Sequence, residues 1–365
     1  MKYYNDINPV VLAMDNFTPL WRTPWAGSRI LRHYKPLVPP QPSGAQVGES
    51  WEISMGPEFP SLAASSGLRL DDLIRTDPAG FLGKEYAAGR ELSALLVKLL
   101  DAGENLSVQI HPSDAYVGLK GDESGKPESW YVLHVEAGAG VYLGFKAGVG
   151  RDDIARSLAR DDQGFCELLN FVALSPGDFV LVEAGVPHAI GKGVTVLEPQ
   201  HVSPGRKGVT YRYWDWNRRY GPTGLASPKG NKRPLHVDDA LAVTDFRLAL
   251  DPDWLARSIV HAGKAESAGA LSIQMLCGPG DARLQSRWLR VARICGTGAS
   301  LTLPDWDVLR GLTLVGGELT LTDFDIPVRC GQSVVLPAAL RRLRVSSQDA
   351  HALLTAVVSP GAFRA

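Results

Sequence analysis

The chain has 365 residues, of which 45% are hydrophobic and 21% charged, an ordinary balance for a folded globular protein. Its formal net charge of -1 gives no electrostatic case for binding nucleic acid or an acidic membrane surface. No run approaches the roughly 18 to 20 apolar residues of a membrane helix, and MKYYNDINPV lacks the apolar segment of a signal peptide. The cysteines have no C-x-x-C spacing, so we expect reduced thiols and a cytoplasmic protein: Cys166, Cys277, Cys295 and Cys330.

The fold class follows from how glycine and proline are distributed. The 38 glycines and 25 prolines fall between short β-rich runs. This pattern predicts a mainly β protein, a sandwich or barrel, and not an α/β wound sheet. The length favours two domains. We expect a catalytic domain over 1–245, with N-terminal strands and a helical insertion near 151–171, and a smaller structural β domain over 246–365.

In the first third of the chain the elements are short. WRTPWAGSRI (21–30) is typical of a loop with a short strand, and GESWEIS (48–54) alternates like a strand. Residues 70–101 predict helical patches followed by the apolar run LLVKLL. The periodicity of that run fits a buried strand and a buried helix equally well.

Further along, RDDIARSLARDDQGFCELLNF (151–171) has the apolar spacing of a helix, with a break near Gly164. FVLVEAGVPHAIGKGVTVLEPQ predicts two strands with His188 at their connection. VTYRYWDWNR (209–218) predicts one more strand, with its arginine and both later tryptophans on one face. From about residue 246 short strands recur to the end of the chain.

A candidate metal site comes from the alternating run LSVQIH, whose polar face carries Ser107, Gln109 and His111. A second β-rich run begins at Glu128. With His188, the side chains of Gln109, His111 and Glu128 make a nitrogen and oxygen ligand set suited to zinc. Two neutral imidazoles, one carboxylate and one amide leave a single net positive charge with Zn²⁺. The alternative is a sheet edge whose polar side chains face water, and a histidine after a Gly-Val-Pro turn is usually a surface residue.

Four separated blocks resemble the type I mannose-6-phosphate isomerases of the short bacterial form, in the family's order: LSVQIHPSDAYV, GKPESWYVL, PGDFVLVEAGVPHAIGKGVTVLEPQ and VTYRYWDWNR. KLLDAGENLSVQIHP and RPLHVDDAL extend the resemblance, which spans roughly 15–240. It implies a cupin (jelly-roll) barrel that interconverts mannose 6-phosphate and fructose 6-phosphate. It also implies one zinc ion per chain, held by Gln109, His111, Glu128 and His188.

The resemblance further implies a catalytic arginine at Arg212 and substrate-facing side chains at Ser107 and Lys126, with Lys126 also a candidate catalytic group. Aldose–ketose isomerisation moves a proton between C1 and C2 through a cis-enediol, and it needs a base, electrophilic help at oxygen and cations for the phosphate. Arg212 keeps its proton, so it suits charge stabilisation or phosphate binding. The base stays open among a metal-bound water, Lys126 and His201.

The chain departs from the family in the basic link HVSPGRKGVTYR, where Arg206 and Lys207 are phosphate contacts or, more commonly, part of a solvated loop. An alanine also replaces one glycine in WRTPWAGSRI, and YWDW has an extra aromatic residue. Two other functions are considered: a cupin oxygenase that holds iron, and a non-catalytic sugar-binding or regulatory cupin. Gln109 in place of a first histidine and the long loop before Glu128 count against the oxygenase. The expected partner is a small sugar phosphate, and no oligomeric state is indicated.

Overall fold

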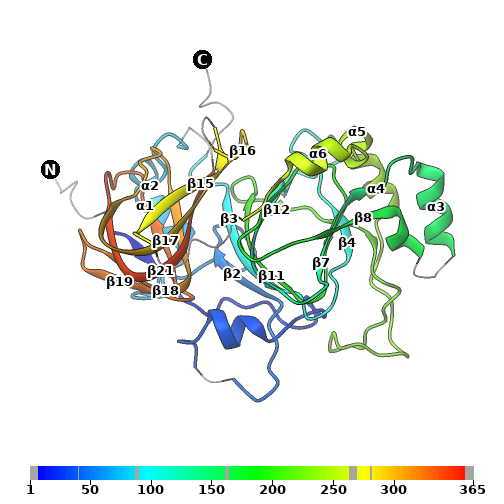
Figure 1. Ribbon diagram of the computed structural model, residues 1–365, viewed down its shortest axis with the longest axis horizontal. Coiled ribbons are helices and arrows are strands. Elements are labelled where there is room, and N and C mark those ends of the chain that lie inside the picture. Colours follow the sequence, from blue (N-terminus) through cyan, green and yellow to red (C-terminus); the bar gives the residue numbers. More distant parts are fainter. Residues whose placement is uncertain are drawn as a thin grey trace.

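The structure, a computed structural model, describes six stretches of the chain: 7–39, 41–86, 90–160, 164–262, 269–279 and 282–357. Its strands make up most of the regular structure and form four sheets (Figure 1). The prediction of a mainly β protein is confirmed. No helix in these stretches is both long and apolar enough to cross a membrane.

Two antiparallel sheets form a jelly-roll barrel, in the right half of Figure 1. The five-stranded sheet has the order β13 (Tyr211–Trp214), β4 (Val108–Ile110), β10 (His188–Ile190), β7 (Gly140–Phe145) and β8 (Leu169–Ala173). The six-stranded sheet has the order β14 (Ile259–Val260), β9 (Phe179–Val182), β6 (Glu128–Val135), β11 (Val194–His201), β3 (Leu95–Asp101) and β2 (Glu49–Ile53). The run LLVKLL is therefore a strand, and every residue of β3 is buried.

A third sheet lies beside the barrel, on the left of Figure 1, and consists mainly of C-terminal strands. Its order is β1 (Val10–Val11), β20 (Ser333–Leu336), β18 (Arg310–Leu321), β21 (Arg344–Val357), β17 (Leu289–Thr302), β15 (Ser272–Gly278) and β16 (Leu284–Gln285), with β19 (Ile326–Arg329) on β18. The N-terminal β1 pairs with β20, and β14 pairs with β9 of the barrel. β1 precedes residue 245 but pairs within the third sheet, and β14 follows it but pairs within the barrel. The division of the chain into 1–245 and 246–365 stays a prediction.

Short helices and one small sheet fill the connections. The helices are a π-helix (Ile30–Tyr34), α1 (Leu70–Thr76), α2 (Pro78–Leu82), α3 (Arg151–Ala159), a 3-10 helix (Gly164–Leu168), α4 (Val237–Val243), α5 (Phe246–Ala249) and α6 (Pro252–Arg257). The small sheet pairs β5 (Glu123–Ser124) with β12 (Lys207–Gly208). In the segment 21–30, Ala26 and Gly27 make only isolated bridges, so no strand forms there.

The helical prediction over 151–171, with its break near Gly164, is correct for α3 and for the 3-10 helix, but it is wrong from Leu169 onward. The chain continues as the 3-10 helix and then as β8, in which Leu169 pairs with Phe145 and Phe171 with Tyr142 of β7. Pairing with an existing strand satisfies the backbone of this segment, and this outweighs a helical spacing of apolar residues.

The segment that contains His188 forms three strands and not two. His188 is the first residue of β10, where it pairs with Leu143 on one side and Gln109 on the other. A histidine expected in a connection is thus fixed inside a sheet. The strand expected over 209–218 ends at Trp214, because Trp216 has a φ of 57°, a left-handed conformation that ends an extended run.

Candidate metal centre

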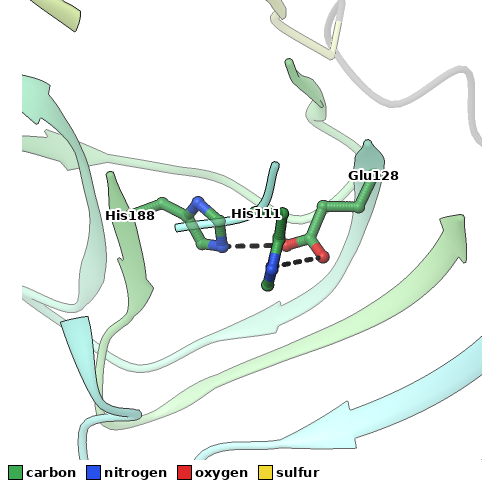
Figure 2. Close-up of side chains that lie close together, drawn as sticks. All are labelled: His111, Glu128 and His188. Atoms are coloured by element: carbon green, nitrogen blue, oxygen red, sulfur yellow. Dashed lines mark ion pairs between the residues drawn. The ribbon is translucent and has the colours of Figure 1, made fainter. Parts of the chain in front are cut away.

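Three buried side chains from different strands converge inside the barrel. His111 directly follows β4, Glu128 begins β6 and His188 begins β10, and they are 2%, 0% and 1% exposed. His111 Nε2 lies 3.1 Å from Glu128 Oε2, and His188 Nε2 lies 3.1 Å from Glu128 Oε1 (Figure 2). In the part of the chain that the structure describes, this is the one group of three such residues whose ligand atoms lie within 4.8 Å of one another.

The tautomers of both imidazoles follow from their second nitrogens. His111 Nδ1 lies 2.9 Å from the carbonyl oxygen of Val209, and His188 Nδ1 lies 2.9 Å from that of Val186. A carbonyl only accepts, so each Nδ1 carries the proton and each Nε2 presents a lone pair to Glu128. Burial, and then the charge of Lys126, lowers the pKa of His111 to about 3, which keeps this ring neutral.

Two lone pairs thus face a carboxylate that also only accepts. Neither Nε2 atom has a hydrogen-bond partner among the described residues, and the same holds for Glu128 Oε1. Buried polar atoms without partners are costly, and acceptors aimed at acceptors repel unless a cation lies between them. The two imidazoles and the carboxylate therefore fit a divalent metal ion such as zinc.

Gln109, the fourth expected ligand, lies in β4 directly across from His188 of β10. On its other side it pairs with Arg212 of β13. Residues paired across neighbouring strands project to the same face of a sheet. This row brings Gln109, His188 and Arg212 together, and Gln109 lines the cavity beside the metal ligands.

Lys126 and Gln200 hold the second oxygen of Glu128. Lys126 Nζ donates to Glu128 Oε2 at 3.1 Å, and Gln200 Nε2 donates to the same oxygen at 2.8 Å. Burial opposes the charge on both members of the ion pair, but their attraction outweighs it. The pKa of Lys126 is raised and that of Glu128 is held well below its usual range.

A cavity of about 280 Å³ adjoins the ligands and contains every other expected site residue, namely Ser107, Lys126 and Arg212. Ser107 is buried in its wall. The cavity is rich in charge and has two tryptophans. Its remaining charged and aromatic lining residues are Arg22, Trp25, Glu49, Trp51, Glu58, Lys98, Glu198 and Arg233.

Most cations of this cavity are already neutralised by a carboxylate. Arg22 makes two hydrogen bonds to Glu58, at 3.0 and 3.1 Å, and Lys98 Nζ lies 3.6 Å from Glu49 Oε2. Arg233 makes two hydrogen bonds to a buried aspartate, Asp215, at 2.6 and 2.8 Å.

Arg212 differs, because no carboxylate of the described chain lies within 4.0 Å of its guanidinium. Its Nη1 donates to the carbonyl of Pro234 at 2.8 Å, and its buried Nε has no hydrogen-bond partner. Burial, and then Arg233, lower its pKa to about 10, so it remains protonated. The cavity wall therefore presents a positive charge that a substrate anion can neutralise.

The segment 234–236, which follows β13 in the chain, holds the backbone of Arg212 in place. The Arg212 amide donates to His236 Nδ1 at 3.2 Å, and the His236 amide donates to the Arg212 carbonyl at 2.8 Å. With the bond to Pro234, three contacts link this segment to the arginine. The segment belongs to RPLHVDDAL, where the sequence had given no role to the histidine.

Sequence reasoning missed the six further charged residues of the cavity, and two of them, Lys98 and Glu198, lie inside apolar strands. Trp130 Nε1 donates to Glu198 Oε1 at 3.2 Å, and burial, followed by the charge of Glu128, raises the pKa of Glu198 to about 8. Both residues are single charges inside apolar strands, LLVKLL and TVLEPQ. Since ionisable residues are almost never fully buried without a partner, that pattern was an available signal.

His201, one of the open candidates for the base, does not line this cavity. Its Nδ1 lies 3.8 Å from Asp114 Oδ2. Arg206 and Lys207 do not line it either. Arg206 donates to the carbonyl of Glu123 at 3.4 Å, and Lys207 Nζ lies 3.9 Å from Asp122, both at the surface. These contacts agree with a solvated loop.

The sequence relatives and the structural neighbours of the chain agree with each other. No protein-family model matches the chain. It is 32% identical over 245 residues to a mannose-6-phosphate isomerase of Streptococcus mutans, covering 64% of this chain and 68% of that protein. It is 36% identical over 168 residues to the mannose-6-phosphate isomerase ManA of Bacillus subtilis, covering 46% of this chain and 47% of that protein.

Among solved structures, the fold matches a mannose 6-phosphate isomerase of Bacillus subtilis with a TM-score of 0.70 and 24% identity, over 96% of this chain and 99% of the other. It also matches a mannose 6-phosphate isomerase bound with zinc and yttrium, with a TM-score of 0.64 and 15% identity, over 96% of this chain and 99% of the other. The predicted cupin fold is confirmed. From the identity to the Streptococcus mutans protein over more than two thirds of its length, this chain belongs to the mannose-6-phosphate isomerase family.

Proposed function

We propose that the protein interconverts mannose 6-phosphate and fructose 6-phosphate by proton transfer through a cis-enediol. One observation carries the proposal: a buried His–Glu–His group with unpaired lone pairs adjoins a cavity that offers an uncompensated guanidinium, Arg212. An electrophile for the sugar oxygens and a cation for the phosphate are two of the three features that this reaction needs, the third being a base. The relatives named mannose-6-phosphate isomerase support the same substrate pair.

One zinc ion per chain would be held by His111, Glu128, His188 and the amide oxygen of Gln109. Neutral imidazoles and a carboxylate are typical zinc ligands, and the backbone carbonyls behind both imidazoles fix the required tautomer. When bound, the ion supplies a Lewis acid that polarises the sugar oxygens. The zinc in a solved relative supports this choice of metal.

The phosphate would bind at the wall formed by Arg212 and Arg233. Asp215 is a single carboxylate, but it pairs with both Arg218 and Arg233. With Arg212, three guanidinium groups and one carboxylate are clustered here, although Arg218 and Asp215 do not themselves line the cavity. A dianion would balance this cluster. Ser107, buried in the wall of the same cavity, would donate a hydrogen bond from its hydroxyl to the sugar.

Lys126 would stabilise the negative charge that develops on oxygen, and Glu198 would transfer the proton. Glu128 holds Lys126 as a cation, which suits it to stabilise the oxygen that becomes negative. Glu198 has a pKa of about 8 and its carboxyl is oriented by Trp130, so it exchanges a proton near neutral pH, as an acid–base catalyst must. A buried carboxyl beside a metal site with a shifted pKa is a common catalytic arrangement.

We also propose that residues 1–245 form the catalytic unit, that 246–365 are structural, and that the protein acts in the cytoplasm. All four cysteines are free, as suits a reducing compartment.

A coupled assay on mannose 6-phosphate, with metal content measured on the same sample, tests the proposal. We expect stoichiometric zinc, and turnover that a chelator abolishes and added zinc restores. Zinc without turnover would instead favour a sugar-binding or regulatory cupin. Iron with oxygen uptake would favour a cupin oxygenase.

A further inference from the structure

A second cavity lies outside the barrel, between β6 and the face of the third sheet formed by β15, β17 and β21. Its volume is about 660 Å³. Pockets for small molecules commonly measure about 300 to 1,000 Å³. No described residue lines both this cavity and the one beside the metal ligands, so the two are separate sites.

The floor of this outer cavity is a polar patch on three neighbouring strands. Ser272 pairs with Cys295, which pairs with His351, and in the next row Gln274 pairs with Arg293. Partners across strands, and residues two apart along a strand, project to the same face of a sheet. All five of these residues line the cavity.

The opposite wall includes Tyr131, which projects from the outer face of β6. Its hydroxyl lies 2.7 Å from His351 Nε2. Burial raises the pKa of Tyr131 to about 12, whereas burial, followed by Arg293, lowers that of His351 to about 4. The phenol and the imidazole are therefore both neutral, and the hydrogen bond between them adds no charge to the cavity.

Arg293 supplies the charge. It is the one permanently ionised side chain among the described residues that line the cavity, and no carboxylate is among them. No ion pair joins it to a carboxylate in the described parts of the chain. The Pro176–Gly177 turn passes close by: a Cβ built on Gly177 would lie 3.9 Å from Arg293 Nη1. The guanidinium is thus enclosed between two sheets and faces the cavity.

We propose that this outer cavity binds a small anionic molecule, with its negative oxygens on Arg293 and its carbon skeleton against Tyr131 and Pro176. A guanidinium offers two parallel N–H donors that match a carboxylate or a phosphate, and both anions share this chemistry. The hydroxyl of Ser272 and the amide of Gln274 add polar partners on the same floor. The proposal does not depend on the isomerase activity.

Cys295 provides a reporter inside the cavity. Cys277 is fully buried, so replacing Cys166 and Cys330 by serine leaves Cys295 as the reactive thiol. The measurement is the rate at which a neutral maleimide modifies this thiol, with citrate, with inorganic phosphate, or with sodium chloride at matched ionic strength. At ten times its dissociation constant, a bound anion slows the reaction about tenfold. We expect slowing by citrate, phosphate or both, and none by chloride.

Arg293→Gln should abolish this protection. Arg290→Gln is the matched control, since Arg290 lies in the same strand but on the other face, 5.9 Å from the ring of Trp306. Should Arg293→Gln unfold, Arg293→Lys keeps the charge without the two parallel donors and should raise the dissociation constant several-fold. Equal protection in Arg293→Gln and wild type overturns the proposal, as does a wild type that neither anion protects. Protection by one anion only identifies the ligand class.

Discussion

Two buried lysine–glutamate pairs occupy different parts of this molecule and have different surroundings. Lys35 Nζ lies 2.7 Å from Glu52 Oε2 where the barrel meets the third sheet, and Lys126 Nζ lies 3.1 Å from Glu128 Oε2 inside the barrel. All four side chains are at most 8% exposed. Burial and ion-pair distance alone do not distinguish a structural pair from a catalytic one.

The neighbours of each pair do distinguish them. Lys35 also donates to the carbonyl of Gly331 at 2.7 Å, and Ser333 donates to Glu52 Oε2 at 3.0 Å. The hydrogen bonds of that pair link the loop that holds Lys35 to β2, which holds Glu52, and to β20, which holds Ser333. In each bond a donor meets an acceptor. Glu128 instead meets two imidazole lone pairs that have no donor to share. Glu52 Oε1 also has no hydrogen-bond partner. What separates the two pairs is therefore that further acceptors, the two imidazole lone pairs, face Glu128 and require a cation.

The largest expected effect is that of Glu128→Ala, which removes the shared carboxylate of the metal centre. Since both imidazoles lose the group that they face, we expect zinc to be lost and kcat/KM to fall on the order of a thousandfold or more. Metal analysis and the coupled assay on one sample measure both effects. A Glu128→Ala protein that turns over substrate without zinc would contradict the mechanism.

Lys35→Met tests the other pair. It leaves the Glu52 carboxylate buried without its cation, and breaking a buried ion pair in this way typically costs about 3 to 5 kcal/mol. We expect the free energy of unfolding in urea to fall by that amount, with kcat and zinc content of the folded protein unchanged. A loss of zinc in Lys35→Met would mean that the two pairs are not independent.

Local patterns predicted much of this architecture. The alternation in LSVQIH correctly put Gln109 on the polar face of a strand, because a period of two is a property of a few adjacent residues. The strand is shorter than expected: Ser107 precedes it and His111 follows it, and Ser107 lines the same cavity as Gln109. The row that joins Gln109, His188 and Arg212 depends on pairing between segments about 80 and 100 residues apart, which only the family resemblance anticipated. Lys98 and Glu198 were missed because an apolar strand was interpreted without its single charge.

Arg212→Lys sharpens the assignment of the uncompensated cation. Lysine keeps the positive charge but loses the planar donors, and it cannot reproduce the bond to Pro234 together with a bond to substrate. One charge-assisted hydrogen bond is worth about 1.5 to 3 kcal/mol, so we expect kcat/KM to fall roughly 10- to 100-fold with full zinc content. Arg233→Lys is the comparison, since Arg233 already has Asp215 as its partner. An equal loss in both variants would argue against a special role for Arg212.

The smallest expected effect comes from His236, which positions Arg212 by accepting its backbone N–H. His236→Ala should lower kcat/KM about two- to tenfold, the value of one ordinary hydrogen bond, and Asn should restore it because Oδ1 accepts in the place of Nδ1. The bond is also made in the ligand-free protein, so His236→Ala should lower the unfolding free energy by about 0.5 to 1.5 kcal/mol. No further loss is expected at α4, because the side chain of His236 makes no capping bond to that helix.

A pH profile separates this positioning role from a merely structural one. Burial, and then Arg212, lower the pKa of His236, so Nδ1 remains an acceptor at neutral pH and is protonated only below the usual range of histidine. As the pH falls through this lowered pKa the wild type loses its acceptor, while His236→Asn has no group to titrate. The ratio of wild-type to His236→Asn kcat/KM should therefore decrease on the acid side, and a ratio that stays constant with pH would show that the imidazole does not hold Arg212 in its active position.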